Sequence, residues 1–404
     1  KKKFKMKKKI LLAVWPYKFT SFTYKKMEFD LLEKKFNIKV VVSDLSNIIN
    51  KNFRKTFKLK NAVNTKNFDS IKSWSIYFKK LKKKNNVFIY NWIDDSGLSA
   101  LKITNIIKSS KLPTIMLASP QLADGKRKKN LQFYKYRIKT FFKHFGLVLY
   151  YLKVIFFKFC FNLNKFENLF LFTAGNTKKI RTIEAKKKTI IPVHSNDYSN
   201  FLVLKKKIKR RKNIVFLDMP QPFFKDDSAY LGFSYNYKTI EWYNDLNKFF
   251  DFLENKYSSK VIVIPHPKVR NVKNPFFGQK NKRIVDHSLD AAQKQIPNSK
   301  FIISHSNVTT AISFAIASYT PILFTYCDQV SSNYKIMNDL KDVSNTTGSP
   351  LMSINNFNKK NFGNFKVNRK KYNHYKYQYL TSKNVKYDSN HEIIGKLIKN
   401  YYKH

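Results

Sequence analysis

The chain has 404 residues, which is long for one domain and comfortable for two. Lys and Arg number 79 against 25 Asp and Glu, so the formal net charge is +54. A hydrophobic fraction of 43%, with 9 glycines and 12 prolines, allows large cores and argues against a low-complexity chain. The charge has two explanations. One is an anionic partner such as nucleic acid, an acidic membrane surface or phosphorylated substrates; the other is compositional drift, which the scattered lysines fit better than a focused groove.

The two cysteines, Cys160 and Cys327, lie far apart and without metal-ligand spacing. This pattern predicts a reduced, cytosolic protein. The first residues, KKKFKMKKKILLAVW, combine a basic flank with a short apolar run. A signal peptide needs a longer apolar core and a small-residue cleavage site, so the run is interpreted as a first buried strand.

The first half of the chain alternates apolar, β-branched runs with helical patterns. Strands are expected at 8–15, 38–44, 85–92 and 112–119, and helices at 22–36 and 98–111. This alternation predicts a parallel, doubly wound sheet. No G-x-G-x-x-G follows the first strand, so the usual dinucleotide fingerprint is missing.

Residues 126–163 form a basic and aromatic segment. In a single helix, at roughly 100° per residue, five lysines share an arc of about 140° and Arg137 lies outside it. These lysines are Lys135, Lys139, Lys143, Lys153 and Lys158. The last two interrupt the run of about 20 apolar residues that a membrane span needs. The segment is interpreted as an interfacial helix on anionic lipid; the alternative is an ordinary helix that covers the sheet with solvated lysines.

A lysine-rich linker at 205–213 precedes a second α/β unit. Its expected elements are a strand and loop at 213–222, a helix at 239–257, a strand at 261–267, a helix and turn at 288–300, and strand, helix and strand over 300–324. After about residue 350 the chain is polar and has one helical segment, at 391–402. The chain is therefore divided into a first Rossmann-like domain at 1–204, a second at 205–349 and a basic tail at 350–404, with a cleft between the two domains.

A histidine held between two prolines ends the strand at 261–267. Ligands of open α/β sheets bind beyond the carboxyl ends of strands. Proline cannot continue a central strand, and the residue before a proline is held extended, so His266 is displayed stiffly at that edge. Lys268 and Arg270 add positive charge. The alternative is a turn histidine that caps the strand.

The stretch SHSNVTTA, residues 304–311, is rich in hydroxyls where a strand gives way to a helix. Its hydroxyl residues are Ser304, Ser306, Thr309 and Thr310. Backbone N–H groups at a helix start favour anions, although plain capping by Ser306 or Asn307 is the alternative. Together with His266 one strand earlier, the stretch predicts a phosphate site.

Adjacent carboxylates, Asp94 and Asp95, follow the strand at 85–92 in the first half. At a strand end facing the cleft, a carboxylate suits a general base; the alternative is a helix cap. Weaker candidates in two further loops are Gln221, Asp226 and Asp227 for contact with a sugar or nucleoside, and His194, Asp197 and Tyr198 near the hinge.

Several other chemistries lack their motifs. The sequence has no HExxH, CxxC or clustered acids for a metal, no G-x-S-x-G and no P-loop. Aromatics in an RNP-like pattern are also missing, so a specific nucleic-acid partner is not expected. No metal and no cofactor are expected.

The second half resembles GT-B glycosyltransferases of bacterial surface-polysaccharide synthesis, over roughly residues 214–325. VIVIPHPK and FIISHSNVTT are similar to the HP and Ser/Thr motif pair of bacterial sialyltransferases and capsule Kdo transferases. The resemblance implies a GT-B-like fold with two Rossmann-like domains facing a central cleft. It also implies that His266 contacts the phosphate of a CMP-sugar, and that Ser304, Ser306 and Thr309 bind phosphate or ribose.

The resemblance further implies that a carboxylate of an acidic-acidic-Gly motif in the first domain is the base. This chain departs from that motif, since Asp-Asp-Ser-Gly carries an inserted residue before the glycine. Which of Asp94 and Asp95 serves, or whether either does, stays open.

These observations lead to one expected function and two rivals. The expected function is a metal-independent glycosyltransferase, peripheral to the cytoplasmic face of the inner membrane. It uses a nucleotide-sugar, with a CMP-activated nonulosonate or Kdo favoured, and a capsule or lipopolysaccharide acceptor. Gln221, Asp227, Lys268, Arg270 and Thr310 complete the expected donor contacts. The rivals are a polyol-phosphate transferase of teichoic-acid type, and a non-catalytic basic protein that binds membrane or nucleic acid.

Overall fold

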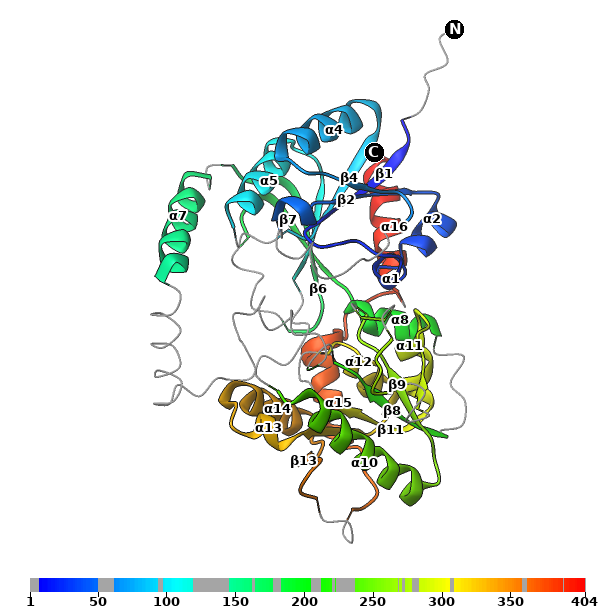
Figure 1. Ribbon diagram of the computed structural model, residues 1–404. Coiled ribbons are helices and arrows are strands. Elements are labelled where there is room, and N and C mark those ends of the chain that lie inside the picture. The colour runs from blue at the N-terminus through cyan, green and yellow to red at the C-terminus, as the bar shows by residue number, and fades with distance from the viewer. Residues whose placement is uncertain are drawn as a thin grey trace.

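The computed structural model describes residues 7–49, 62–93, 97–118, 145–161, 164–176, 183–204, 212–219, 222, 237–267, 269–270, 273–277, 283–305, 309–357, 362–387 and 389–403. Two parallel α/β sheets, each covered by helices, form separate units stacked one above the other (Figure 1). The two-domain α/β architecture expected from the sequence is confirmed.

The first sheet has seven parallel strands within the described residues, in the order β3-β2-β1-β4-β5-β6-β7. The strands are β1 (Lys9–Trp15), β2 (Lys39–Asp44), β3 (Thr65–Asn67), β4 (Asn86–Asn91), β5 (Thr114–Ala118), β6 (Phe166–Thr173) and β7 (Ala185–Pro192). In β1, Leu12 pairs with Val41 on one side and with Ile89 on the other. These central strands are continuous apolar runs because helices cover both faces of the sheet.

The helices of the first unit divide between the two faces of this sheet. They are α1 (Ser21–Lys26), α2 (Phe29–Phe36), α3 (Ser46–Ile49), α4 (Ile71–Lys84), α5 (Leu98–Ser109) and α7 (Phe145–Phe161). Leu11 and Ala13 of β1 belong to the core on the α2 side, whereas Ile10 and Leu12 belong to the core on the α4 and α5 side. Among the described helices, none combines the length and the apolarity that a membrane crossing requires.

The second sheet has six parallel strands within the described residues, in the order β10-β9-β8-β11-β12-β13. They are β8 (Asn213–Leu217), β9 (Val261–Ile264), β10 (Ile284–Val285), β11 (Ser299–Ser304), β12 (Ile322–Tyr326) and β13 (Leu351–Ser353). Its helices are α8 (Asn196–Leu204), α10 (Thr239–Tyr257), α11 (Ala291–Gln295), α12 (Ile312–Ser318), α13 (Asp328–Ser331), α14 (Tyr334–Thr347) and α15 (Arg369–Tyr375). The strand order reverses at β8, and a doubly wound sheet offers a crevice at such a point.

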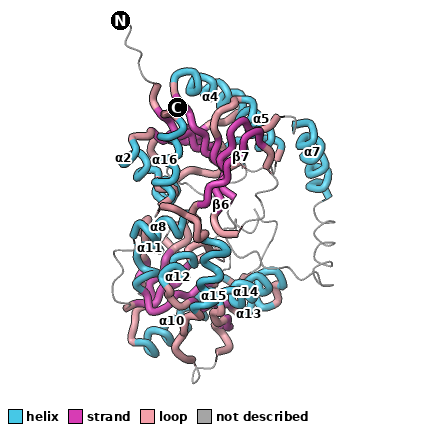
Figure 2. The backbone as a smooth tube through the Cα atoms, turned by 180° about the vertical axis from the view of Figure 1, so that it is seen from behind, coloured by secondary structure: helices cyan, strands magenta, loops and turns pink. Residues whose placement is uncertain are grey.

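The end of the chain returns from the second unit to the first. After α15, the π-helix Lys376–Leu380 leads across to α16 (Asn390–Tyr401), which packs on α2 beside the first sheet (Figure 2). Gly395 of α16 lies so close to Phe36 that a Cβ atom there would stand 2.4 Å from the ring. The segment after residue 350, expected to be a basic tail, thus contributes apolar side chains to the cores of both units.

The chain passes between the two units twice, and the two connecting segments are hydrogen-bonded to each other. Ser195 donates its backbone N–H to the carbonyl of Leu380 at 2.7 Å. The side chain of Asn390 accepts from the backbone N–H of His194 at 3.0 Å and donates to the carbonyl of His194 at 2.8 Å. Since these groups are buried, they fix the place where the second unit joins the first.

Candidate functional site

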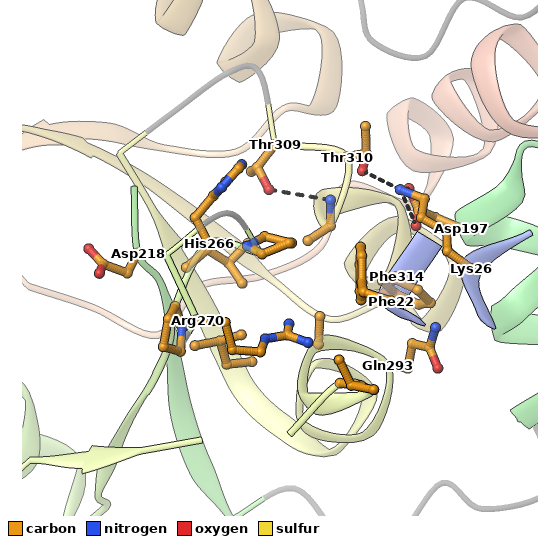
Figure 3. A pocket seen from close by; sticks show the side chains of 17 residues that line it. Phe22, Lys26, Asp197, Asp218, His266, Arg270, Gln293, Thr309, Thr310 and Phe314 are labelled. Carbon is orange, nitrogen blue, oxygen red and sulfur yellow. Dashed lines mark hydrogen bonds and ion pairs between the residues drawn. The ribbon is translucent and has the colours of Figure 1, made fainter. Parts of the chain in front are cut away.

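A cavity of about 240 Å³ lies where the two units meet (Figure 3). The second unit supplies most of its wall, from the carboxyl ends of β8 and β9 and from the residues before α12. The first unit contributes Phe22 and Lys26 of α1. The cavity is therefore at the switch point of the second sheet, with one wall from the other domain.

The end of β9 brings His266 into the cavity. The four residues of β9 are buried, and Pro265 then ends the strand. The carbonyl of Ile264 accepts from the backbone N–H of Asp218 at 3.0 Å, so the strand ends of β8 and β9 lie side by side. A turn follows, in which Val269 donates its N–H to the carbonyl of His266 at 2.9 Å. This turn returns the chain to the cavity at the next residue, Arg270.

Arg270 is a buried cation, and its side chain is only 5% exposed. Burial lowers the pKa of its guanidinium, while the nearby carboxylates of Asp286 and Asp290 oppose that shift. The guanidinium lies over the ring of Phe22, 5.0 Å from its centroid. Its Nε and Nη1 are buried and have no hydrogen-bond acceptor in the described protein. A buried guanidinium with open donors at a cavity wall is suited to an anionic ligand.

Lys26 ties the first unit to the second across the cavity. Its Nζ lies 3.0 Å from each carboxylate oxygen of Asp197, the second residue of α8. The same Nζ donates to Oγ1 of Thr310 at 3.1 Å. Because Asp197 is only 7% exposed, the ammonium group compensates a charge that would be costly alone.

Asp218 is a second carboxyl group in the cavity wall. Burial raises its pKa to about 8, although hydrogen bonds from the Met219 backbone and the Asn274 side chain pull the other way. The group is therefore protonated near neutral pH, and a protonated carboxyl can donate a hydrogen bond. A neutral Asp218 adds no negative charge to the cavity wall, so it does not oppose the attraction of Arg270 for an anion.

The end of β11 differs from that of β9. Ser304 is fully buried, and His305 is 4% exposed between the rings of Phe216 and Trp242. The Nδ1 atom of His305 bonds Oγ1 of Thr325, and burial lowers the histidine pKa to about 4. His305 is thus a neutral core residue.

Among the described residues after β11, Thr309 is the first that lines the cavity. Its Oγ1 lies 3.4 Å from the backbone nitrogen of Ala311, just before α12 begins at Ile312. Of the expected catalytic and donor-binding residues, four line this one cavity: His266, Arg270, Thr309 and Thr310. Ser304 lies inside the sheet and is not among the lining residues.

Seven proposed residues lie outside the described part of the chain: Asp94, Asp95, Gln221, Asp226, Asp227, Lys268 and Ser306. Among the lining residues that carried little or no signal in the sequence are Phe22, Lys26, Asp218 and Gln293. Asp218 could have been found, since it directly follows the apolar run NIVFL. Asp197 was a weak candidate that the structure places in the wall. In the described ranges, no group of three or more His, Cys, Asp or Glu side chains is arranged to hold a metal ion.

No protein-family model matches the chain, and no curated protein matches it in sequence. Solved structures do match. The wall teichoic acid polymerase TagF is 13% identical, with a TM-score of 0.53, over 98% of this chain and 89% of that one. A UDP-N-acetylglucosamine 2-epimerase is 12% identical, with a TM-score of 0.44, over 99% of this chain and 98% of that one. The MnaA–UDP complex of S. aureus is 12% identical, with a TM-score of 0.42, over 98% of this chain and 97% of that one.

At these identities the similarity concerns the fold, and the match to the polymerase is the one above a TM-score of 0.5 among these three. It runs along almost the whole chain, through both units. Two Rossmann-like domains that meet at a cavity, arranged as in that polymerase, make this a GT-B-like fold.

Proposed function

We propose that the protein is a glycosyltransferase that moves a sugar from a nucleotide-sugar to a surface-glycan acceptor. The single observation that carries the proposal is Arg270, a buried guanidinium with unbonded donors at the wall of the interdomain cavity. Phosphate oxygens would satisfy these donors with charge-assisted hydrogen bonds. His266 and the hydroxyl of Thr309 line the same cavity and would complete the phosphate contacts.

In this proposal the protein's own side chains stabilise the leaving group. The acceptor hydroxyl attacks the anomeric carbon, the bond from that carbon to the phosphate oxygen breaks, and negative charge grows on the nucleotide phosphate. Arg270, with His266 and the neutral carboxyl of Asp218, would hold that charge without a metal ion. The proton of the acceptor passes to a base, for which Asp94 or Asp95 is proposed from the family resemblance.

The identity of the donor rests on the motif resemblance of VIVIPHPK and FIISHSNVTT. We propose a CMP-activated nonulosonate or Kdo, with a capsule or lipopolysaccharide acceptor, at the cytoplasmic face of the inner membrane. Gln221, Asp227, Lys268 and Ser306 remain proposed donor contacts, as does Thr310. Ser304, expected from the sequence to bind phosphate or ribose, is fully buried in β11 and does not line the cavity.

A polyol-phosphate transferase of teichoic-acid type is the second candidate. The observation that favours it is the match in fold to the wall teichoic acid polymerase, whose TM-score of 0.53 exceeds those of the epimerase and of the MnaA–UDP complex. Such an enzyme would use the same cavity for a phosphate, but it would transfer a polyol phosphate and leave the nucleotide monophosphate behind.

Thermal-shift measurements with CMP, CDP, UDP and GDP test the proposal. We expect CMP to raise the melting temperature of the wild type and to have no effect on the Arg270→Met variant. Stabilisation by none of the four would overturn the donor site, and stabilisation by UDP alone would overturn the CMP assignment. Release of CMP from a CDP-polyol, with none from a CMP-sugar, would establish the second candidate instead.

A further inference from the structure

Helix α7 carries large apolar side chains that face solvent. Leu152 is 57% exposed, Ile155 63%, Phe156 64% and Phe159 81%. Figures 1 and 2 both place α7 at the margin of the first unit, on the outside of α5. Isolated apolar residues on a surface are ordinary, but four close together on one helix indicate a surface with a partner.

The four side chains form a single face of the helix. At roughly 100° per residue, Leu152, Ile155, Phe156 and Phe159 fall within an arc of about 100°. Val154 is 6% exposed and points about 150° away from the centre of that arc, so the opposite side of α7 is the buried one. The docking of α7 on α5 therefore turns its apolar face outward.

Positive charge flanks this apolar face on both sides. Lys153 and Lys158 are exposed, and each lies about 110° from the centre of the arc, one to either side. Residues 145–161 contain no Asp or Glu, in a chain whose formal net charge is +54. Lysines in these positions can extend their aliphatic stems along a membrane surface and place the ammonium groups among phosphates. A second copy of the same face would instead bring like charges together.

We propose that this face, formed by Leu152, Ile155, Phe156 and Phe159, inserts into the interfacial layer of a membrane rich in anionic lipid. The apolar side chains supply the burial energy, and Lys153 and Lys158 supply the preference for negative headgroups. The inference is independent of the reaction in the cavity, because no residue of α7 lines that cavity.

The test is co-sedimentation of the full chain with vesicles of phosphatidylcholine alone or with 30% phosphatidylglycerol. A chain this basic binds anionic vesicles through charge alone, so the decisive variant is Phe156→Ser/Phe159→Ser, which leaves the charge unchanged. We expect it to reduce affinity for the mixed vesicles at least tenfold. The matched control is Ile240→Ser on α10, since Ile240 is 66% exposed and lies in the other unit; its affinity should equal that of the wild type.

Lys153→Gln/Lys158→Gln should lower affinity for the anionic vesicles and weaken its dependence on salt. Equal binding by the wild type and the double serine variant would overturn the proposal, as would equal binding to both kinds of vesicle. A wild-type dimer that the serine substitutions turn into a monomer, measured by light scattering without lipid, would assign the face to a second copy instead. An unchanged melting temperature in the absence of lipid, measured by circular dichroism for every variant, confirms that the fold is intact.

Discussion

The ends of β9 and β11 lie in the same sheet, yet their polar residues meet opposite surroundings. Beyond β9, Arg270 carries open hydrogen-bond donors at the cavity wall. Beyond β11, His305 bonds Thr325 inside an aromatic core, and Thr310 accepts from Lys26 of the other unit. Donors of Arg270, beyond β9, are thus open to a ligand, whereas His305 and Thr310, beyond β11, are hydrogen-bonded within the protein.

The difference shows that a polar residue at a strand end becomes part of a site only if the following turn leads it back to the cavity. After β9, two prolines stop the strand at once, and a tight turn places Arg270 at the wall. After β11, His305 is buried, and among the described residues that follow it Thr309 is the first that lines the cavity. Substitutions on the two sides should therefore affect different properties.

Arg270→Met is expected to have the largest effect. Each charge-assisted hydrogen bond contributes roughly 1.5–3 kcal/mol, and about 1.4 kcal/mol corresponds to tenfold in affinity. Loss of the Nε and Nη1 donors should weaken binding of the stabilising nucleotide at least 100-fold, measured by isothermal titration calorimetry. The free energy of unfolding should change by less than about 1 kcal/mol, because the substitution removes buried donors that lack protein partners.

The control for Arg270→Met is a substitution beyond β11. His305→Asn alters a buried residue that directly follows β11 and does not line the cavity. Measured below the melting temperature of the variant, its affinity for the nucleotide should stay within about threefold of the wild-type value, since no ligand contact is lost. If the two variants bound the nucleotide equally well, the distinction between the two strand ends would fail.

Much of the fold could be predicted from the sequence, because each central strand is an apolar run ended by turn residues. The run VIVI before Pro265 is the clearest case, and it is strand β9. The gathering of His266, Arg270, Thr309 and Thr310 around one cavity was also predictable, since parallel strands end at the same edge.

The contribution of the first unit to the cavity was not predictable. Lys26 is one of many scattered lysines, and its partners Asp197 and Thr310 are 171 and 284 positions away. Such a pairing depends on how the two domains dock, for which a single sequence carries no periodic signal. The return of α16 to the first sheet is a similar case, because an amphipathic helix shows which face it buries but not against what.

The buried histidine should produce an acid-dependent loss of stability. The pKa of His305 is about 4 in the folded protein, below the value of about 6.5 for an exposed histidine. The unfolded chain therefore binds a proton that the folded chain does not, and stability falls as pH drops from about 6.5 towards 4, by up to about 1.4 kcal/mol per pH unit. We expect urea unfolding to show this slope in the wild type.

His305→Asn removes the titrating group but keeps a side chain that can bond Thr325. The variant should be less stable than the wild type at pH 7, by about 2 kcal/mol, because it fits the aromatic core less well. The difference in free energy of unfolding between the two proteins should narrow as the pH falls, since only the wild type is destabilised by protonation of the histidine. A gap that stays constant from pH 7 to pH 4 would show that His305 is not held neutral by the core.

The smallest effect is expected for the ion pair of Lys26 and Asp197, which joins the two units at the cavity wall. A double-mutant cycle with Lys26→Met and Asp197→Asn should give a coupling energy of about 1 kcal/mol in urea unfolding, because the carboxylate is buried and the lysine is largely covered. The matched control is the exposed pair of Lys238 and Glu241, with side chains 73% and 57% accessible. There the coupling should be close to zero, since water and side-chain entropy offset the attraction. Equal coupling energies in the two cycles would mean that the ion pair of Lys26 and Asp197 is no stronger than a surface contact. The contrast between the two sides of the cavity would then fail.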